Sequence, residues 1–150
     1  MRTSRSSGGN WLREGDRLGY VLDSTFVVDL LRSDPDAKKR AKELDAGREP
    51  KLLSTPVLYE IASGLLYTRS RSEAAAFQRL SANFTIVPFD EGSALKAAEI
   101  RAELMKLGKV KSHVDTMIAG IAAAGRHILV SRDEDFQVIS GALGLQVESY

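Results

Sequence analysis

Residues 20–31 read YVLDSTFVVDLL, and the rest of the chain is organised around this stretch. Residues 20–22 form a short apolar run typical of a buried strand, and residues 26–31 predict an apolar helix shortly after it. Asp23 follows the strand, at the edge where open α/β sheets place their ligands. It can hold a cation there, or it can simply cap the following helix. This stretch alone leaves both roles open.

The composition excludes several classes of protein. The chain has 150 residues and no cysteine, so neither disulfides nor thiolate metal sites can form. Its two histidines, His113 and His127, are too few for a zinc site built on several imidazoles. The net charge of +1 means that any nucleic-acid contact needs a local basic patch. With no signal-peptide pattern and no apolar run of ~18 residues, we expect a cytoplasmic protein without membrane contact.

Strands alternate with helices along the remainder of the chain. We expect strands at residues 51–54, 84–89, 127–131 and 145–148. The third expected helix begins at Thr55-Pro56 and ends at a basic turn, residues 67–72. The other expected helices are at 37–46, from Ser72 to 82, at 90–107, at 116–124 and from Phe136 onward. Thr55 is the expected N-cap of the third helix. This alternation predicts a single-domain α/β sandwich of three layers, with a mainly parallel central sheet and helices on both faces. The domain spans 19–150 and follows a polar, flexible N-terminal extension, residues 1–18.

Acidic residues stand at several points that such a sheet would bring to one edge. They are Asp23 after the first strand, Glu60 early in the third helix, Asp115 at the start of a buried helix, and Asp133 and Asp135 after the strand at 127–131. Carboxylates gathered in this way repel one another unless a cation joins them. Oxygen ligands without thiols favour Mg²⁺ or Mn²⁺. Acidic clusters of this kind occur in metal-dependent phosphodiester hydrolysis.

Structural roles compete with this interpretation. Ser112 and Asp115 have the spacing of a capping box. Glu60 borders an apolar helix stripe. Burying an ionised carboxylate there costs on the order of several kcal/mol unless a cation, such as a nearby arginine, pairs with it. Each acid therefore has an alternative role in stability.

Four motifs, taken in order, resemble those of a PIN domain of the VapC toxin type. They are VLDST at 21–25, YEI at 59–61, DTMIAGIAAAG at 115–125 and LVSRDEDF at 129–136, and the final GLQVESY at 144–150 is similar to the last strand of the family. The resemblance covers about residues 19–150. Thr25 stands where asparagine or serine is common in the family, and the N-terminal extension is unusual for it.

The resemblance implies a Mg²⁺- or Mn²⁺-dependent endoribonuclease, usually a toxin that a small antitoxin neutralises and often a homodimer. The family's metal ligands correspond to Asp23, Glu60, Asp115 and Asp133, with Asp135 as the alternative fourth ligand and one carboxylate as general base. Thr25 and Ser131 would support Asp23. The candidate contacts to RNA phosphates are the basic residues Arg69, Arg71, Lys109, Lys111 and Arg132.

Two other functions are compatible with parts of the sequence. A phosphatase of the haloacid dehalogenase type would use Asp23 as nucleophile, but such enzymes need a second aspartate where this chain has Thr25. A catalytically inactive PIN-like scaffold for RNA or protein would need none of the acids, and all of them are present. A metal-binding titration separates these alternatives from a metal-dependent nuclease.

Overall fold

The structure is a computed structural model, and it describes residues 18–150. The strands in this range are β1 (Tyr20–Leu22), β2 (Lys51–Ser54), β3 (Thr85–Val87), β4 (Ile128–Val130) and β5 (Gln146–Glu148). The helices are α1 (Ser24–Leu31), α2 (Pro35–Ala46), α3 (Thr55–Thr68), α4 (Arg71–Ser81), α5 (Glu91–Lys106), α6 (His113–Ala124) and α7 (Glu134–Val138). The predicted extension, residues 1–18, lies outside the described residues except for Leu18.

All five strands belong to one parallel sheet, in the order β3-β2-β1-β4-β5. The predicted α/β sandwich is therefore confirmed. β1 lies at the centre of the sheet, and its Leu22 is in register with Val130 of β4. Because the strands run in the same direction, the residues after them, Asp23 and Ser131, leave the sheet side by side at its carboxyl edge.

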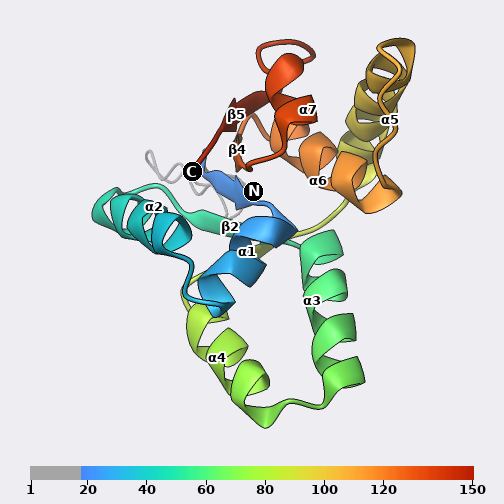
Figure 1. Cartoon of the computed structure of the whole chain (residues 1–150). Coiled ribbons are helices and arrows are strands. Elements are labelled where there is room, and N and C mark those ends of the chain that lie inside the picture. The colour runs from blue at the N-terminus through green and yellow to red at the C-terminus, as the bar shows by residue number, and fades with distance from the viewer. Residues whose placement is uncertain (1–17) are drawn as a thin grey trace, which may run out of the picture.

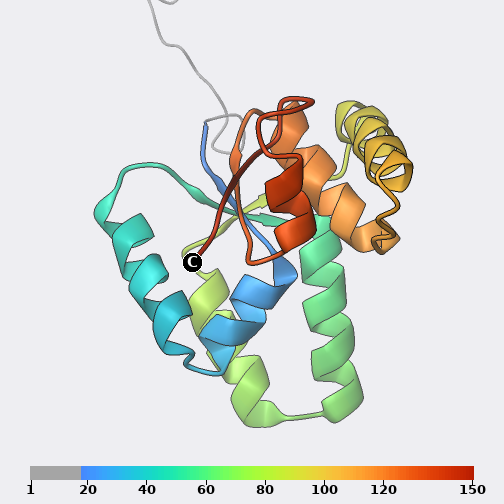
Figure 2. The ribbon, with the colours of Figure 1, turned by 45° about the horizontal axis from the view of Figure 1, so that its top comes forward.

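Helices lie on both sides of this sheet (Figures 1 and 2). α6 packs against β1 and β4, and α5 packs against the outside of α6. This contact is close, because a Cβ added to Gly120 of α6 would lie 2.5 Å from the Ser93 carbonyl oxygen and 2.6 Å from the Ala97 Cβ. On the other side α1 contacts α2, α3 and α4. α3 and α4 extend away from the sheet as a hairpin (Figure 1).

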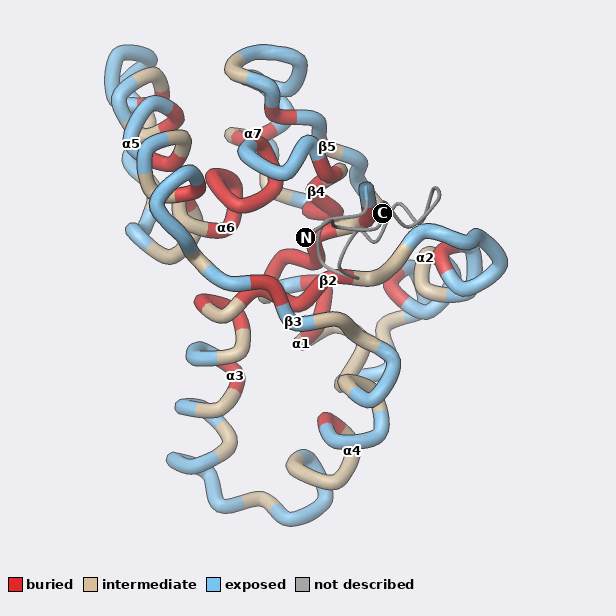
Figure 3. The backbone as a smooth tube through the Cα atoms, turned by 180° about the vertical axis from the view of Figure 1, so that it is seen from behind, coloured by how far each residue is buried: buried red, intermediate tan, exposed pale blue. Residues whose placement is uncertain are grey.

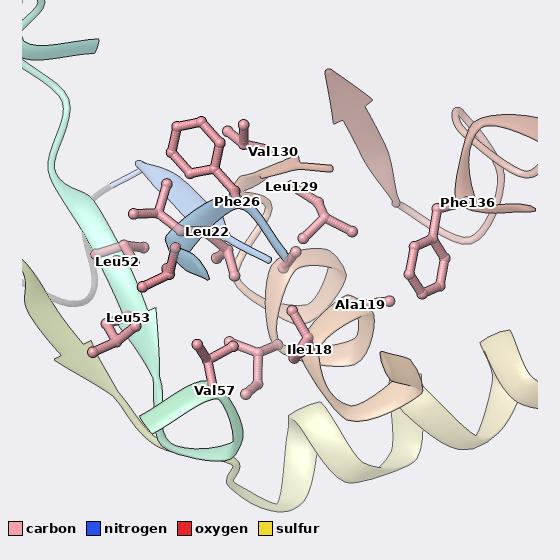
Figure 4. Packing of buried hydrophobic residues seen from close by; sticks show 14 of the residues in the cluster. Leu22, Phe26, Leu52, Leu53, Val57, Ile118, Ala119, Leu129, Val130 and Phe136 are labelled. Atoms are coloured by element: carbon pink, nitrogen blue, oxygen red, sulfur yellow. The ribbon is translucent and has the colours of Figure 1, made fainter. Parts of the chain in front are cut away.

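The core lies between the sheet and the helices that cover it. Buried residues are concentrated in the central strands and in α6, whereas the far end of the α3–α4 hairpin is exposed (Figure 3). Leu22, Leu52 and Leu129 come from three adjacent strands and are fully buried, with Phe26 of α1 beside them (Figure 4). Each such side chain contributes about 1.5–3 kcal/mol to folding. The core therefore fixes the strand ends that carry the acids.

Several predicted boundaries were wrong, mainly because capping side chains start the helices earlier. Asp23 caps α1 at Ser24, Ser112 caps α6 at His113, and Asp133 caps α7 at Glu134. β3 ends at Val87, since Pro88 has no N–H to donate to a neighbouring strand.

One predicted cap and one predicted helix start were also wrong. The N-cap of α3 is Ser54, whose hydroxyl accepts a hydrogen bond from Val57 N, while the Thr55 hydroxyl accepts one from Phe89 N. α4 begins at Arg71 with Ser70 as its N-cap, not at Ser72, because Arg69 turns the chain with φ 54° and ends α3 directly before it.

None of the helices found between residues 18 and 150 combines the length and apolar character needed to cross a membrane.

Candidate active site

Asp23 is buried at the carboxyl edge of the sheet, with an exposed fraction of only 5%. One carboxylate oxygen accepts a hydrogen bond from Ser24 N at 2.8 Å, and the other accepts one from the Ser131 hydroxyl at 2.7 Å. Burial, together with the charges of Asp115 and Asp133, raises the pKa of the Asp23 carboxyl to about 6, although the hydrogen bonds from Ser131 and Ser24 oppose the rise. The fold therefore holds this carboxylate close to two others.

The turn after β4 brings Asp133 to the same edge. Its backbone N–H donates to the Ser131 hydroxyl at 3.0 Å, so Ser131 links Asp133 to Asp23. The Asp133 carboxylate also caps α7 by accepting a hydrogen bond from Asp135 N at 2.9 Å. This turn thus orients two predicted site residues through a single serine hydroxyl.

Asp115 lies in the first turn of α6 and is half-buried. The Ser112 hydroxyl accepts a hydrogen bond from Asp115 N at 3.1 Å, which is the half of a capping box that needs only the backbone of Asp115. Its carboxylate acts electrostatically on Asp23 and on Lys111. The side chain of Asp115 therefore faces the acid cluster.

Two lysines of the connector before α6 bind the acids of the β4–α7 turn. The Lys111 ammonium group pairs with Asp133 and lies 3.5 Å from Asp135, and Lys109 lies 3.1 Å from Asp135. Burial would lower the pKa of Lys111, but the carboxylates of Asp133, Asp115 and Asp135 outweigh it and raise that pKa. The hydrogen bond from Lys109 in turn lowers the pKa of Asp135.

Glu60 lies on the other side of the cluster, and it is exposed. The expected cost of burying its charge therefore does not arise, and within residues 18–150 it forms no ion pair with an arginine. It lines a pocket between α1 and α3 together with Ser24 and Thr25. Thr25 is exposed, and in the described part of the chain Asp23 receives its hydrogen bonds from Ser24 and Ser131.

Arg132 is bound within the protein. Its guanidinium group lies 2.8 Å from Asp34 and 3.7 Å from Asp29, and it stacks 4.2 Å from the centre of the Tyr150 ring. The Tyr150 hydroxyl donates to Asp29 at 2.6 Å, and burial together with this bond raises the pKa of Tyr150. Sequence reasoning missed Asp29 and Tyr150, because nothing in the local pattern reveals contacts between residues so distant in the chain.

The structure does not bring all the predicted RNA contacts to the acids. Arg69 and Arg71 lie at the turn between α3 and α4, at the end of the hairpin away from the sheet (Figure 1). Lys109, Lys111 and Arg132 do lie beside the acid cluster, but each is ion-paired.

The donor chemistry of the cluster fits a hard divalent cation. Asp23, Asp115 and Asp133 come from three different elements, supply only oxygen atoms, and interact electrostatically. Within residues 18–150, no three acidic or histidine side chains lie close enough together in this structure to enclose an ion. Lys111 instead neutralises Asp133 and Asp135.

A parallel sheet with acids at its carboxyl edge defines an α/β protein with an acidic site. The sequence profile of the PIN domain matches residues 20–142, which is most of the chain. The protein therefore belongs to the PIN domain family.

Individual relatives agree with this assignment. The chain is 27% identical over 132 residues to ribonuclease VapC5 of Mycobacterium tuberculosis, covering 85% of this chain and 92% of that protein. It is 24% identical over 130 residues to the tRNA(fMet)-specific endonuclease VapC of Shigella flexneri, covering 83% and 94%. Among solved structures, VapBC2 from Rickettsia felis bound to a promoter DNA fragment is similar with a TM-score of 0.75 and 24% identity, covering 88% and 98%.

Proposed function

We propose that the protein is a metal-dependent endoribonuclease and the toxin of a toxin–antitoxin pair. The observation that carries the proposal is the buried carboxylate of Asp23 beside Asp115 and Asp133, at the carboxyl edge of a PIN domain sheet. Both curated relatives are named as an RNA-cleaving enzyme, a ribonuclease and a tRNA-specific endonuclease. The reaction we propose is hydrolysis of RNA phosphodiester bonds. We propose a cytoplasmic location, because the RNA substrate is found there.

Mg²⁺ or Mn²⁺ is the proposed cation, held by Asp23, Asp115 and Asp133 with Glu60 or Asp135 beside them. When bound, such an ion lowers the pKa of water and stabilises the charge of the leaving oxygen. Ser24 N and the Ser131 hydroxyl fix both oxygens of Asp23, so that carboxylate keeps its orientation. A second carboxylate of the cluster can take the proton of the attacking water.

The proposed protein partner is a small antitoxin. Similar structures include VapBC complexes from Rickettsia felis and Salmonella typhimurium, both bound to DNA. We propose that the antitoxin presents an arginine or lysine to the acids, as Lys111 does within this chain. A homodimer is the proposed assembly of the toxin itself.

One observation favours the alternative, a catalytically inactive RNA- or protein-binding scaffold. Lys111 neutralises Asp133 and Asp135, which a scaffold without metal would need. The haloacid dehalogenase alternative has no such support, since the chain belongs to a different family.

Cleavage of RNA with and without metal tests the proposed function. We expect the purified protein to cut single-stranded RNA in Mg²⁺ or Mn²⁺, to stop in excess EDTA, and to recover when the ion is restored. As a control, the variant Asp90→Asn should cut RNA like the wild type. Asp90 caps α5 outside the acid cluster, and asparagine keeps that cap. Cleavage that persists in excess chelator would reject metal dependence, and no cleavage with either ion would favour the scaffold.

Co-expression with the neighbouring gene product tests the antitoxin. We expect a stable complex that cuts RNA much more slowly than the free protein. A complex as active as the free protein would reject inhibition by this partner.

A further inference from the structure

The pocket between α1 and α3 begins directly beside Asp23. It has a volume of about 350 Å³, which is in the size range of small-ligand sites. Ser24 and Thr25 line it at the Asp23 end, and Arg32 lines it at the other end of α1. Val28 and Ile61 give it an apolar lining, Asp29 lines it on the α1 side, and Glu60 stands on the α3 side. The pocket therefore joins apolar surface, hydroxyl groups, one cation and two carboxylates next to the acid cluster.

The charges around the acid cluster single out Arg32. Lys109, Lys111 and Arg132 are each ion-paired with carboxylates of the chain. Arg32 forms no ion pair within residues 18–150, even though Glu60 and Asp29 line the same pocket, because Asp29 is bound by Tyr150 and Arg132 instead. It can therefore bind an anion without first breaking an existing contact, whereas the other three cannot.

The position of Arg32 also determines which phosphate it can reach. Arg32 follows α1, and its Cα is about 13 Å from Asp23 along the helix axis, given a rise of 1.5 Å per residue. An arginine side chain on a helix leans back toward the N-terminus, which shortens this separation. Arg32 thus lies beyond the reacting phosphate and within reach of a neighbouring one. Glu60 on the α3 side can accept a hydrogen bond from a ribose hydroxyl or a base amino group.

We propose that the α1–α3 pocket holds the nucleotide next to the cleaved bond, with Arg32 bound to that nucleotide's phosphate. This inference rests on the proposed ribonuclease function. It assigns RNA binding to an arginine that the sequence pattern did not indicate, and it makes Lys109, Lys111 and Arg132 partners of the protein's own acids. The test must distinguish RNA binding by Arg32 from a contact between Arg32 and a protein partner.

The test measures RNA binding in an Asp115→Asn background, in which we expect cleavage of the probe to be strongly slowed. The probe is a fluorescein-labelled single-stranded RNA of mixed sequence, followed by anisotropy over a range of salt concentrations. Arg32→Gln removes the charge while keeping the backbone N–H that donates to the Val28 carbonyl oxygen at the end of α1. Arg32→Lys keeps the charge. Arg126→Gln is the control, because Arg126 is exposed before β4, at the opposite edge of the sheet.

We expect Arg32→Gln to weaken RNA binding about tenfold, the value of one charge-assisted hydrogen bond. The slope of log Kd against log salt should fall by about 0.7, because one phosphate contact to a single strand is lost. Arg32→Lys should restore most of the slope, and Arg126→Gln should change neither quantity. With Asp115 intact, Arg32→Gln should raise KM and leave kcat unchanged, since Arg32 does not touch the reacting atoms.

Failure of this inference differs from failure of the proposed function. If Asp115-intact protein cuts RNA but Arg32→Gln matches Arg126→Gln in affinity and slope, the pocket assignment is overturned and the ribonuclease stands. The assignment is also overturned if Arg32→Gln weakens only the complex with the protein partner. If the protein cuts no RNA in either metal, the proposed function fails first.

Discussion

On one side of the acid cluster Asp23 is buried and accepts two hydrogen bonds, whereas on the other side Glu60 is exposed beside an open pocket. The first side, with Ser131, Asp133 and Lys111, is connected by hydrogen bonds and ion pairs to the central strands. The second side lies between two helices, and in the described residues neither Glu60 nor Arg32 forms an ion pair there. The difference indicates that the fold fixes the orientation of the carboxylates on the first side and leaves the second side open.

The largest expected effect is on the connected side, at Asp115. Asp115→Asn should reduce RNA cleavage ~10²-fold or more at saturating Mg²⁺, because a hard cation prefers a carboxylate to an amide oxygen. Thermal melting without metal should hold or rise, since the Ser112 cap uses only the backbone of Asp115 and repulsion with Asp23 is relieved. Paired melting and cleavage assays check this. Lower melting with cleavage retained would make Asp115 a purely structural residue.

The second effect concerns the pH dependence of stability at Asp23. Folding raises its pKa from 3.8 to about 6, so the folded state favours the protonated form. The stability that this gives is full below pH 3.8 and is lost as the pH rises through about 6. Asp23→Asn avoids that loss, and we expect it to be more stable than wild type by about 2–3 kcal/mol at pH 8 without metal. Urea unfolding at pH 8 and pH 3.5 measures the difference in unfolding free energy between Asp23→Asn and wild type. A difference that is the same at both pH values contradicts the burial effect.

Glu60 tests the open side. Glu60→Gln should change stability by less than about 0.5 kcal/mol at any pH, because the side chain is exposed. Cleavage should fall about tenfold, less than in Asp115→Asn, since Glu60 lies at the edge of the cluster. Thermal melting and RNA cleavage assays measure both effects. A loss as large as that of Asp115→Asn would place Glu60 among the central ligands and remove the contrast between the two sides.

The smallest effect is expected at Lys111, the ion-pair partner of Asp133. Lys111→Met should bind Mn²⁺ several-fold more tightly, because the ammonium group no longer competes with the ion for Asp133 and Asp135. Isothermal titration with Mn²⁺ measures this, and Lys106→Met on α5 is a control for loss of one positive charge. Weaker RNA binding with unchanged Mn²⁺ affinity would instead make Lys111 a phosphate contact.

The sequence by itself determined the order of strands and helices and the acids that follow them. Apolar runs such as residues 20–22 and cap residues such as Asp23 are local signals, and they identify an element from its own residues. The same signals failed at Thr55 and Ser72, where a second hydroxyl residue one or two positions earlier caps the helix and only the backbone path selects between them.

Only the tertiary structure decided which charges meet. Their basic charge near the predicted acid site made Lys111 and Arg132 candidate RNA contacts, but folding brings Lys111 to Asp133 and Arg132 to Asp34, residues far apart in the chain. The α1–α3 pocket and its Arg32 arise in the same way, from two helices separated in the chain by α2 and β2. Ion pairs and pockets depend on the relative position of distant elements, and the packing of the whole core sets that position.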